Sequence, residues 1–238
     1  IVFGDWSSDV CSSDLGWDAD GGFAEFALVP EAYAYRIPEV FSDVEAAPLL
    51  CAGIIGYRAL RRSGVAPGGR LGLFGFGSSA RVVLRLALHR GCEVFVATRG
   101  PARQDQARRM GAAWAGGLSE PMPAALDSAI VFSPDGESVP PALRALRKGG
   151  VVALAGIHMS PIPSLTYAEH LFHEKELRSV EANTRADGEE LLREAAEIPL
   201  RPRTVVLPLA AAAEALGALA AGRLEGTAVL VPDPEHGR

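Results

Sequence analysis

The sequence Gly75-Phe76-Gly77-Ser78-Ser79-Ala80 constrains the fold of this 238-residue chain more than any other feature. It matches the pattern G-x-G-x-x-G/A. It lies between an apolar run at 70–74 and a stretch at 78–90 whose apolar residues recur at helical spacing. A strand that leads through such a turn into a helix is typical of parallel sheets that bind a dinucleotide. The same turn can also join strand and helix without binding a ligand.

The residue types in this turn suit a pyrophosphate. Gly75 permits a tight turn, Gly77 has no Cβ to keep a phosphate away, and Ala80 lets the helix pack close to the sheet. Ser78 and Ser79 begin the helix, where backbone N–H groups and the positive end of the helix dipole attract anions. We therefore predict that these five residues bind the pyrophosphate of a nicotinamide dinucleotide.

Strand and helix patterns alternate along most of the chain, which predicts βαβ units with right-handed crossovers and an α/β, doubly wound parallel sheet of the Rossmann type. At Ser42, a capping box with Glu45 predicts a helix start. Strands are expected at 23–29, 70–74, 93–98, 114–115, 127–132, 151–155, 177–182, 203–207 and 227–231. Helices are expected at 43–50, 54–63, 78–90, 101–110, 138–147, 187–196 and 210–221.

The end of the second strand of this sheet bears on the choice of cofactor. Sheets that bind NAD usually carry an Asp or Glu there for the adenosine ribose, whereas this chain has Thr98 and Arg99. A carboxylate would repel a 2′-phosphate, and an arginine can pair with it. We expect Thr98 and Arg99 to face the ribose and the protein to prefer NADP(H), unless Arg99 points into solvent.

Composition and charge disfavour several classes of protein. The net charge is −6 and no long basic run occurs, so nucleic-acid binding has little support. No apolar run approaches the length of a membrane span. The three cysteines are scattered and do not form a disulfide framework. These features are those of a globular protein, and we expect it to be cytoplasmic.

The first fifteen residues do not resemble the rest of the chain. The chain starts at Ile1 rather than at a methionine, and the stretch 5–15 is rich in Ser and Asp without helical or strand periodicity. Its last seven residues can be encoded by GAC GTG TGC TCT TCC GAT CT, which resembles the end of a sequencing adapter. We expect a non-native or disordered leader at 1–15 and place no function there, not even on Cys11.

Two further segments carry a resemblance to a known family. Asp20-Gly21-Gly22-Phe23-Ala24-Glu25-Phe26 and Ala46-Ala47-Pro48-Leu49-Leu50-Cys51-Ala52-Gly53, followed by the glycine turn, resemble the medium-chain, zinc-dependent alcohol dehydrogenases. The resemblance covers nearly all of 16–232. It implies that Cys51 is a ligand of the catalytic zinc, which is consistent with the thiolate being a good zinc ligand. Taken alone, a cysteine in an apolar helix is more often a core residue, and Cys92 is interpreted as one.

The resemblance also implies a domain plan and a function. A remnant of a GroES-like β-barrel catalytic domain would occupy 16–50, the Rossmann domain 51–182, and the return to the incomplete barrel 183–238. The activity would be oxidation of an alcohol or reduction of an aldehyde, with NADP (or NAD) and Zn²⁺, in a homo-oligomer pairing along the strand at 177–182. The remaining catalytic residues are unknown, because the family's other zinc ligands lie in a segment that has no counterpart before Gly16.

Other positions are weaker candidates. The resemblance places Gly156 and Ile157 near the nicotinamide, although core packing would also account for them. Arg185 either touches the cofactor or forms a surface salt bridge, and Thr227 stands where many relatives have an arginine for the pyrophosphate. Two alternatives to a dehydrogenase stay open, namely a nucleotide-binding fragment without turnover and a zincless NADPH reductase of quinones or enones.

Overall fold

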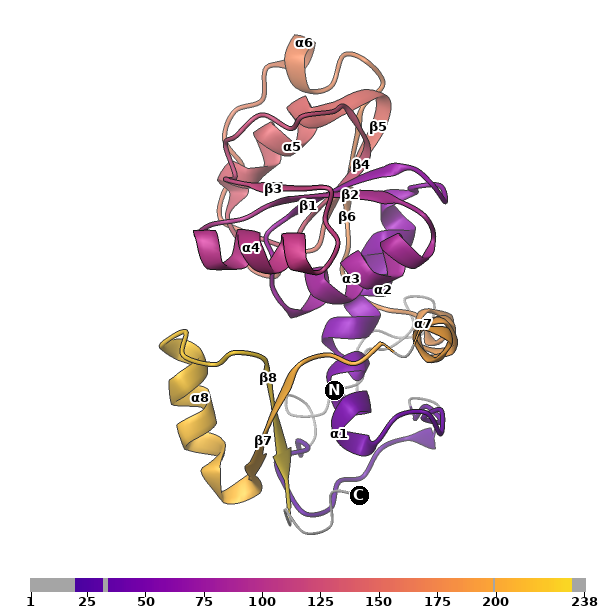
Figure 1. Ribbon diagram of the computed structural model, residues 1–238, viewed down its shortest axis with the longest axis vertical. Helices are drawn as coiled ribbons and strands as arrows, with labels where there is room; N and C mark the ends of the chain where they lie inside the picture. The colour runs from indigo at the N-terminus through magenta and orange to yellow at the C-terminus, as the bar shows by residue number, and fades with distance from the viewer. Residues whose placement is uncertain (1–19, 32–33, 199, 233–238) are drawn as a thin grey trace. The chain divides into compact units, whose positions relative to one another are not determined.

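The computed structural model describes residues 20–31, 34–198 and 200–232 of the chain (Figure 1). The leader at 1–15 therefore lies outside the described residues. The chain divides into two compact units, one made of residues 55–181 and the other of the residues up to Ile54 together with those from Ala182 onwards. None of the helices in the described ranges is long and apolar enough to cross a membrane.

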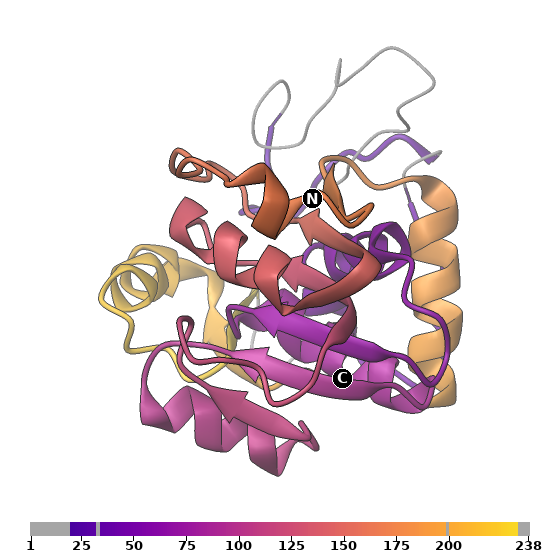
Figure 2. The same ribbon diagram turned by 90° about the horizontal axis from the view of Figure 1, so that it is seen from above.

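The unit made of residues 55–181 is built on a six-stranded parallel sheet with the order β3-β2-β1-β4-β5-β6 (Figure 2). This order confirms the doubly wound Rossmann sheet predicted from the sequence. In this order β2 and β3 follow on one side of β1, and β4, β5 and β6 follow on the other. The direction of the strand order therefore reverses between β1 and β4, and sheets of this type bind ligands at such a switch point. The strands are β1 (Arg70–Phe74), β2 (Glu93–Ala97), β3 (Trp114–Gly116), β4 (Leu126–Val131), β5 (Leu146–Leu154) and β6 (Glu176–Ser179).

Most of the strands are connected by helices. Six side chains of the 12-residue helix α3 are buried, so its buried face is wider than the single apolar stripe that the helical spacing predicts. Proline at the start of α4 and of α5 suits a helix N-terminus, where its missing N–H costs no hydrogen bond. The helical elements are α2 (Ala52–Ser63), α3 (Ser78–His89), α4 (Pro101–Arg109), η3 (Gly136–Ser138), α5 (Val139–Ala145) and α6 (Tyr167–His170).

The connection from β3 to β4 is different. Residues 117–125 form turns and bends and contain no helix. Pro121 and Pro123 lie in it, and proline both removes a backbone donor and blocks a helix interior. Leu118, Met122 and Ala124 of this connection pack against the core cluster that includes Phe74 and Leu126. A loop therefore covers a part of the sheet where a crossover helix would be expected.

In its described residues, the second unit contains three short helical segments, two longer helices and a small sheet. Capping boxes formed by Ser42 with Glu45 and by Thr184 with Asp187 begin α1 and α7. Strands β7 and β8 pair in parallel. The elements are α1 (Asp43–Ala46), η2 (Ala47–Leu50), α7 (Arg185–Glu197), β7 (Thr204–Pro208), η4 (Leu209–Ala211), α8 (Ala212–Ala220) and β8 (Thr227–Val231).

Two expectations in this second unit were wrong. The strand predicted at 23–29 does not form: the segment bends, and the side chains of Phe26 and Leu28 are 88% and 93% exposed. A strand needs a neighbouring strand to pair with, and in the described ranges this segment pairs with none. The helix predicted at 43–50 changes after Ala46 into a 3-10 turn that contains Pro48, because proline cannot continue an α-helix interior.

Candidate cofactor site

The turn after β1 requires glycine at its first position. The backbone of Gly75 has φ +95°, and its N–H donates to the carbonyl oxygen of Ala97 at 2.8 Å. A Cβ at Gly75 would lie 2.9 Å from the backbone nitrogen of Ser133. Both the positive φ and the close neighbour exclude a side chain, so Gly75 sets the shape of the turn.

The second glycine has a different environment. Gly77 is the N-cap of α3, its backbone is extended, and no side chain caps the helix there. A Cβ at Gly77 would meet nothing within 4 Å. Packing within the protein therefore does not explain this glycine, whereas an anion approaching the N-terminus of α3 would. Ala80, in the first turn of α3, is fully buried.

The carboxyl ends of β1, β4 and β5 meet beside this turn. The N–H groups of Phe132 and Ser133, just after β4, both donate to the carbonyl oxygen of Phe74, at 2.8 and 3.1 Å. A Cβ at Gly156, after β5, would lie 2.7 Å from the carbonyl oxygen of Ser133. Gly156 is thus needed for packing. Ile157, the next residue, is 71% exposed, so its side chain is accessible to a ligand.

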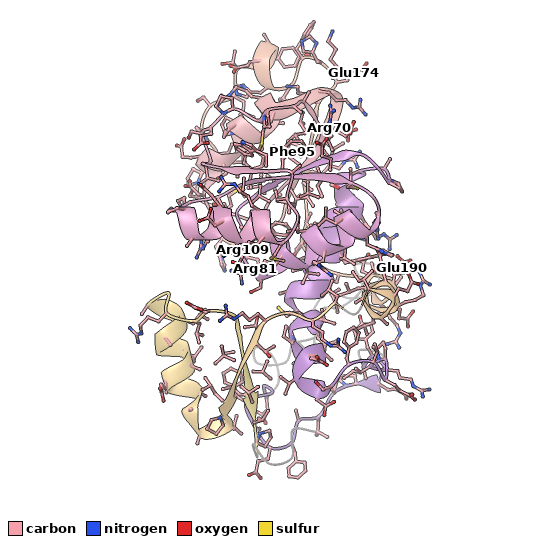
Figure 3. The ribbon with its side chains drawn as sticks, viewed as in Figure 1. Arg70, Arg81, Phe95, Arg109, Glu174 and Glu190 are labelled. Carbon is pink, nitrogen blue, oxygen red and sulfur yellow. The ribbon has the colours of Figure 1, made fainter. Side chains whose placement is uncertain are left out.

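Two residues near the turn have structural features that sequence reasoning missed. Ser133 contributes the backbone against which Gly75 and Gly156 pack, and its sequence neighbourhood contains no motif. The four-residue spacing of Arg81, Arg85 and His89 in the sequence predicts a solvated helix face. Arg81, which Figure 3 labels, is instead half-buried, and its guanidinium carbon lies 5.9 Å from the centre of the Phe76 ring. A cation is therefore held one helical turn from the N-terminus of α3.

The end of β2 carries no carboxylate. Thr98 is 1% exposed, its N–H donates to the carbonyl oxygen of Gly116 at 2.9 Å, and its own carbonyl oxygen accepts from Nε2 of Gln104 at 3.1 Å. Arg99 is exposed. Of the two residues expected to face the ribose, Arg99 is therefore the one whose side chain can reach a ligand.

The two described cysteines differ. Cys92 is buried and its Sγ lies 3.6 Å from the carbonyl oxygen of Ala66, which confirms its interpretation as a core residue. Cys51 belongs to the other unit and is half-buried, and burial raises the pKa of its thiol. Among the described residues, no group of three or more His, Cys, Asp or Glu side chains could hold a metal. These residues alone therefore do not fit a catalytic zinc site.

Two further polar residues have structural partners. His170 lies three residues from His173, a spacing that can place two ligands on one helix face, but without a third ligand the sequence favours surface or packed residues. His170 is 3% exposed and its Nδ1 lies 2.9 Å from the carbonyl oxygen of Thr166. Nε of Arg185 lies 2.8 Å from Oε1 of Glu189, and the guanidinium carbon lies 5.4 Å from the centre of the Tyr35 ring. Arg185 thus forms the salt bridge that was one of its two expected roles.

Comparison with known proteins places the chain among alcohol dehydrogenases, although no protein-family model matches it. It is 50% identical over 94% of its length to the "Probable alcohol dehydrogenase AdhA" of Mycobacterium tuberculosis and spans 66% of that protein. It is 34% identical over 41% of its length to the NADP-dependent alcohol dehydrogenase 6 of Saccharomyces cerevisiae, of which it spans 27%.

A solved structure agrees with this placement. The cinnamyl alcohol dehydrogenase of Sorghum bicolor superposes with a TM-score of 0.74 at 25% identity, over 85% of this chain and 58% of that one. The parallel sheet with the strand order of a Rossmann fold, the glycine turn after β1 and the similarity to these proteins lead to one conclusion. The chain belongs to the medium-chain, zinc-dependent alcohol dehydrogenase family.

Proposed function

We propose that this chain is the cofactor-binding part of an NADP-preferring alcohol dehydrogenase, and that the whole protein oxidises an alcohol or reduces an aldehyde. The observation that carries the proposal is Gly77: the protein leaves open space at a helix N-terminus that no side chain caps. The likeness to proteins named alcohol dehydrogenases supports the activity.

In the proposed complex, the turn from Gly75 to Ala80 holds the pyrophosphate against the N-terminus of α3. Arg99 pairs with the 2′-phosphate, and Ile157 lies near the nicotinamide. The bound cofactor supplies or accepts a hydride. The residues of this chain orient it, because the carboxyl ends of β1, β4 and β5 meet at one point of the sheet.

We propose that zinc is bound only by the whole protein. Cys51 is a candidate ligand, but the described residues supply no set of three ligands that could hold the metal. We propose that residues 1–238 by themselves bind NADP(H) without turnover. Metal analysis after purification, together with alcohol-dependent reduction of NADP, tests this point. Stoichiometric zinc with sustained NADPH production would contradict it.

Calorimetric titration with NADPH and NADH tests the cofactor preference. We expect NADPH to bind at least about tenfold more tightly, the scale of one charge-assisted contact. Arg99→Gln should abolish most of this difference and leave NADH binding unchanged. Arg103→Gln, which removes an exposed arginine from the neighbouring α4, is the matched control and should change neither affinity. Equal affinities of the unmodified chain for the two cofactors would refute the preference.

We also propose that the whole protein is a homo-oligomer in which β6 contributes to the interface. Strand β6 is the last of the six-stranded sheet, and an unpaired strand edge favours pairing with another chain.

A further inference from the structure

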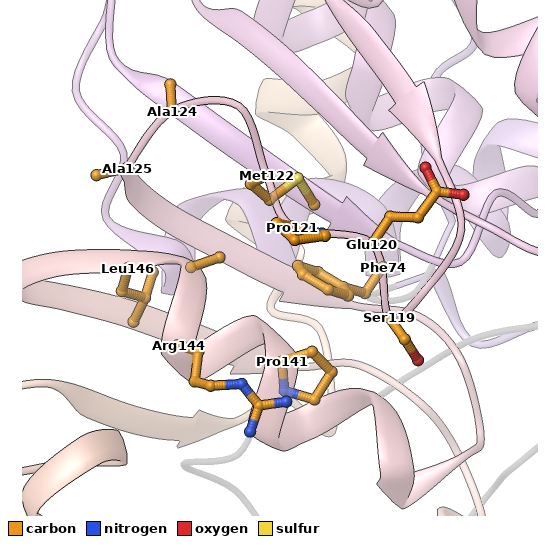
Figure 4. A pocket seen from close by; sticks show the side chains of 11 residues that line it. Phe74, Ser119, Glu120, Pro121, Met122, Ala124, Ala125, Pro141, Arg144 and Leu146 are labelled. Carbon is orange, nitrogen blue, oxygen red and sulfur yellow. The ribbon is translucent and has the colours of Figure 1, made fainter.

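A cavity of about 440 Å³ lies under the helix-free connection between β3 and β4. Phe74, which is 1% exposed, contributes to its floor, and the connection itself forms one wall. The C-terminal part of α5 and the start of β5 form the opposite wall (Figure 4). The lining is mainly apolar: Phe74, Pro121, Met122, Ala124, Ala125, Pro141, Ala145 and Leu146, with Ser119, Glu120 and Arg144 as the polar members.

The cavity exists because residues 117–125 take the place of a crossover helix. A helix would cover this face of the sheet with its own side chains, whereas the proline-containing loop covers it only in part. The volume lies within the range of small-molecule sites. None of the residues predicted to bind the nicotinamide cofactor lines the cavity, although Phe74 immediately precedes the glycine turn.

Two contacts hold the cationic residue of the cavity in position. Nη1 of Arg144 lies 3.2 Å from Nε2 of His170, and Nε lies 3.6 Å from Oε1 of Glu169. With its proton on Nδ1, the His170 ring donates to the carbonyl oxygen of Thr166 and leaves Nε2 to accept from Arg144. Within the described part of the chain, Nη2 of Arg144 makes no hydrogen bond, so it remains available to an acceptor.

Glu120, the acidic residue of the cavity lining, is directed toward its own loop. The carboxylate of Glu120 lies against its own loop, since a Cβ at Gly116 or Gly117 would come within 2.5 or 2.9 Å of one of its oxygens. Figure 4 shows the side chains of Glu120 and Arg144 pointing in different directions. The cavity thus combines an apolar floor with an arginine in its lining that has one nitrogen, Nη2, without a hydrogen bond, which is the complement of an apolar body that ends in a carboxylate.

We propose that this cavity is a second ligand site, which binds a small monocarboxylic acid with an apolar body. The apolar body packs against Phe74, Met122 and Leu146, and the carboxylate accepts a hydrogen bond from Nη2 of Arg144. The site goes beyond the proposed dehydrogenase function and does not depend on it.

Binding of 4-phenylbutyrate and of its neutral analogue 4-phenylbutanamide to the full chain tests the proposal. Saturation-transfer NMR detects binding and calorimetric titration measures affinity. We expect the acid to bind about tenfold more tightly than the amide, since a hydrogen bond to a charged group contributes on this scale. Arg144→Gln should remove that difference, and Arg144→Lys should retain part of it.

A second variant fills the cavity and leaves the charge of Arg144 unchanged. Ala125→Trp places a large side chain in the cavity from an exposed loop position and should abolish binding of both compounds. Arg109→Gln removes an exposed arginine on α4 that does not line the cavity, and should bind as the unmodified chain does. Circular dichroism checks that each variant is folded.

Three outcomes would overturn the proposal. The first is that neither compound binds, and the second is that acid and amide bind equally well. The third is that saturating NADPH displaces the acid, because the cavity would then belong to the cofactor site. Failure of NADPH to bind at all would contradict only the proposed function, so the two proposals fail separately.

Discussion

Replacing Gly75 and Gly77 by alanine, one at a time, separates the structural role of the glycine turn from its binding role. In Gly75→Ala the new residue must adopt φ +95° and place its Cβ 2.9 Å from the backbone nitrogen of Ser133. The left-handed conformation costs about 1–2 kcal/mol in an alanine. Overpacking against backbone, which cannot rotate away, costs about 1–3 kcal/mol more. The free energy of unfolding should therefore fall by about 2–5 kcal/mol.

Gly77→Ala should affect binding and leave stability nearly unchanged. The backbone of Gly77 is already extended and the position of its Cβ is empty. Loss of a favoured N-cap residue, about 0.5–1 kcal/mol, and the lower entropy of the unfolded chain, about 0.4–1 kcal/mol, nearly offset each other. The new methyl group would stand between α3 and a pyrophosphate, so NADPH affinity should fall at least about tenfold.

Urea unfolding followed by circular dichroism measures the first effect, and calorimetric titration with NADPH measures the second. With a urea dependence of about 2 kcal/mol per M, the midpoint of Gly75→Ala should fall by roughly 1–2.5 M, and that of Gly77→Ala should stay close to the unmodified value. The reasoning fails if Gly75→Ala is as stable as the unmodified chain, or if Gly77→Ala binds NADPH with unchanged affinity.

Three further substitutions test local interactions. Thr184→Ala removes the capping box of α7 and should lower the free energy of unfolding by about 1 kcal/mol in a urea titration. The backbone N–H of Arg70, and then Arg147, hold the pKa of Asp127 below its ordinary value. Its stabilising contribution is thus present above the ordinary carboxyl pKa and is lost as pH falls through the lowered one, so Asp127→Asn should flatten the acid limb of a stability–pH curve. Gly188→Ala would place a Cβ 2.5 Å from the Tyr35 ring, and its melting temperature should fall well below that of Gly217→Ala, whose Cβ meets nothing within 4 Å.

The class of the sheet and the glycine turn could be predicted from the sequence because they depend on local patterns. These are the spacing of apolar residues in α3, the alternation of short apolar strands with helices, and the order Gly75, Gly77, Ala80. The order of the strands within the sheet came from the structure. The capping box at Ser42 is likewise contained in a few residues and was located correctly.

Contacts between distant residues were decided by the tertiary structure. The segment at 23–29 has a strand pattern but no strand beside it in the described ranges, because pairing depends on a second chain segment. Thr98 is buried and Arg99 exposed, although they are adjacent in sequence. The reason that Gly156 must be glycine is the carbonyl oxygen of Ser133. The cavity at Arg144 likewise arises where a loop replaces a helix over the sheet. Local patterns determine which elements form, and only the packing of those elements determines which side chains are left accessible to a ligand.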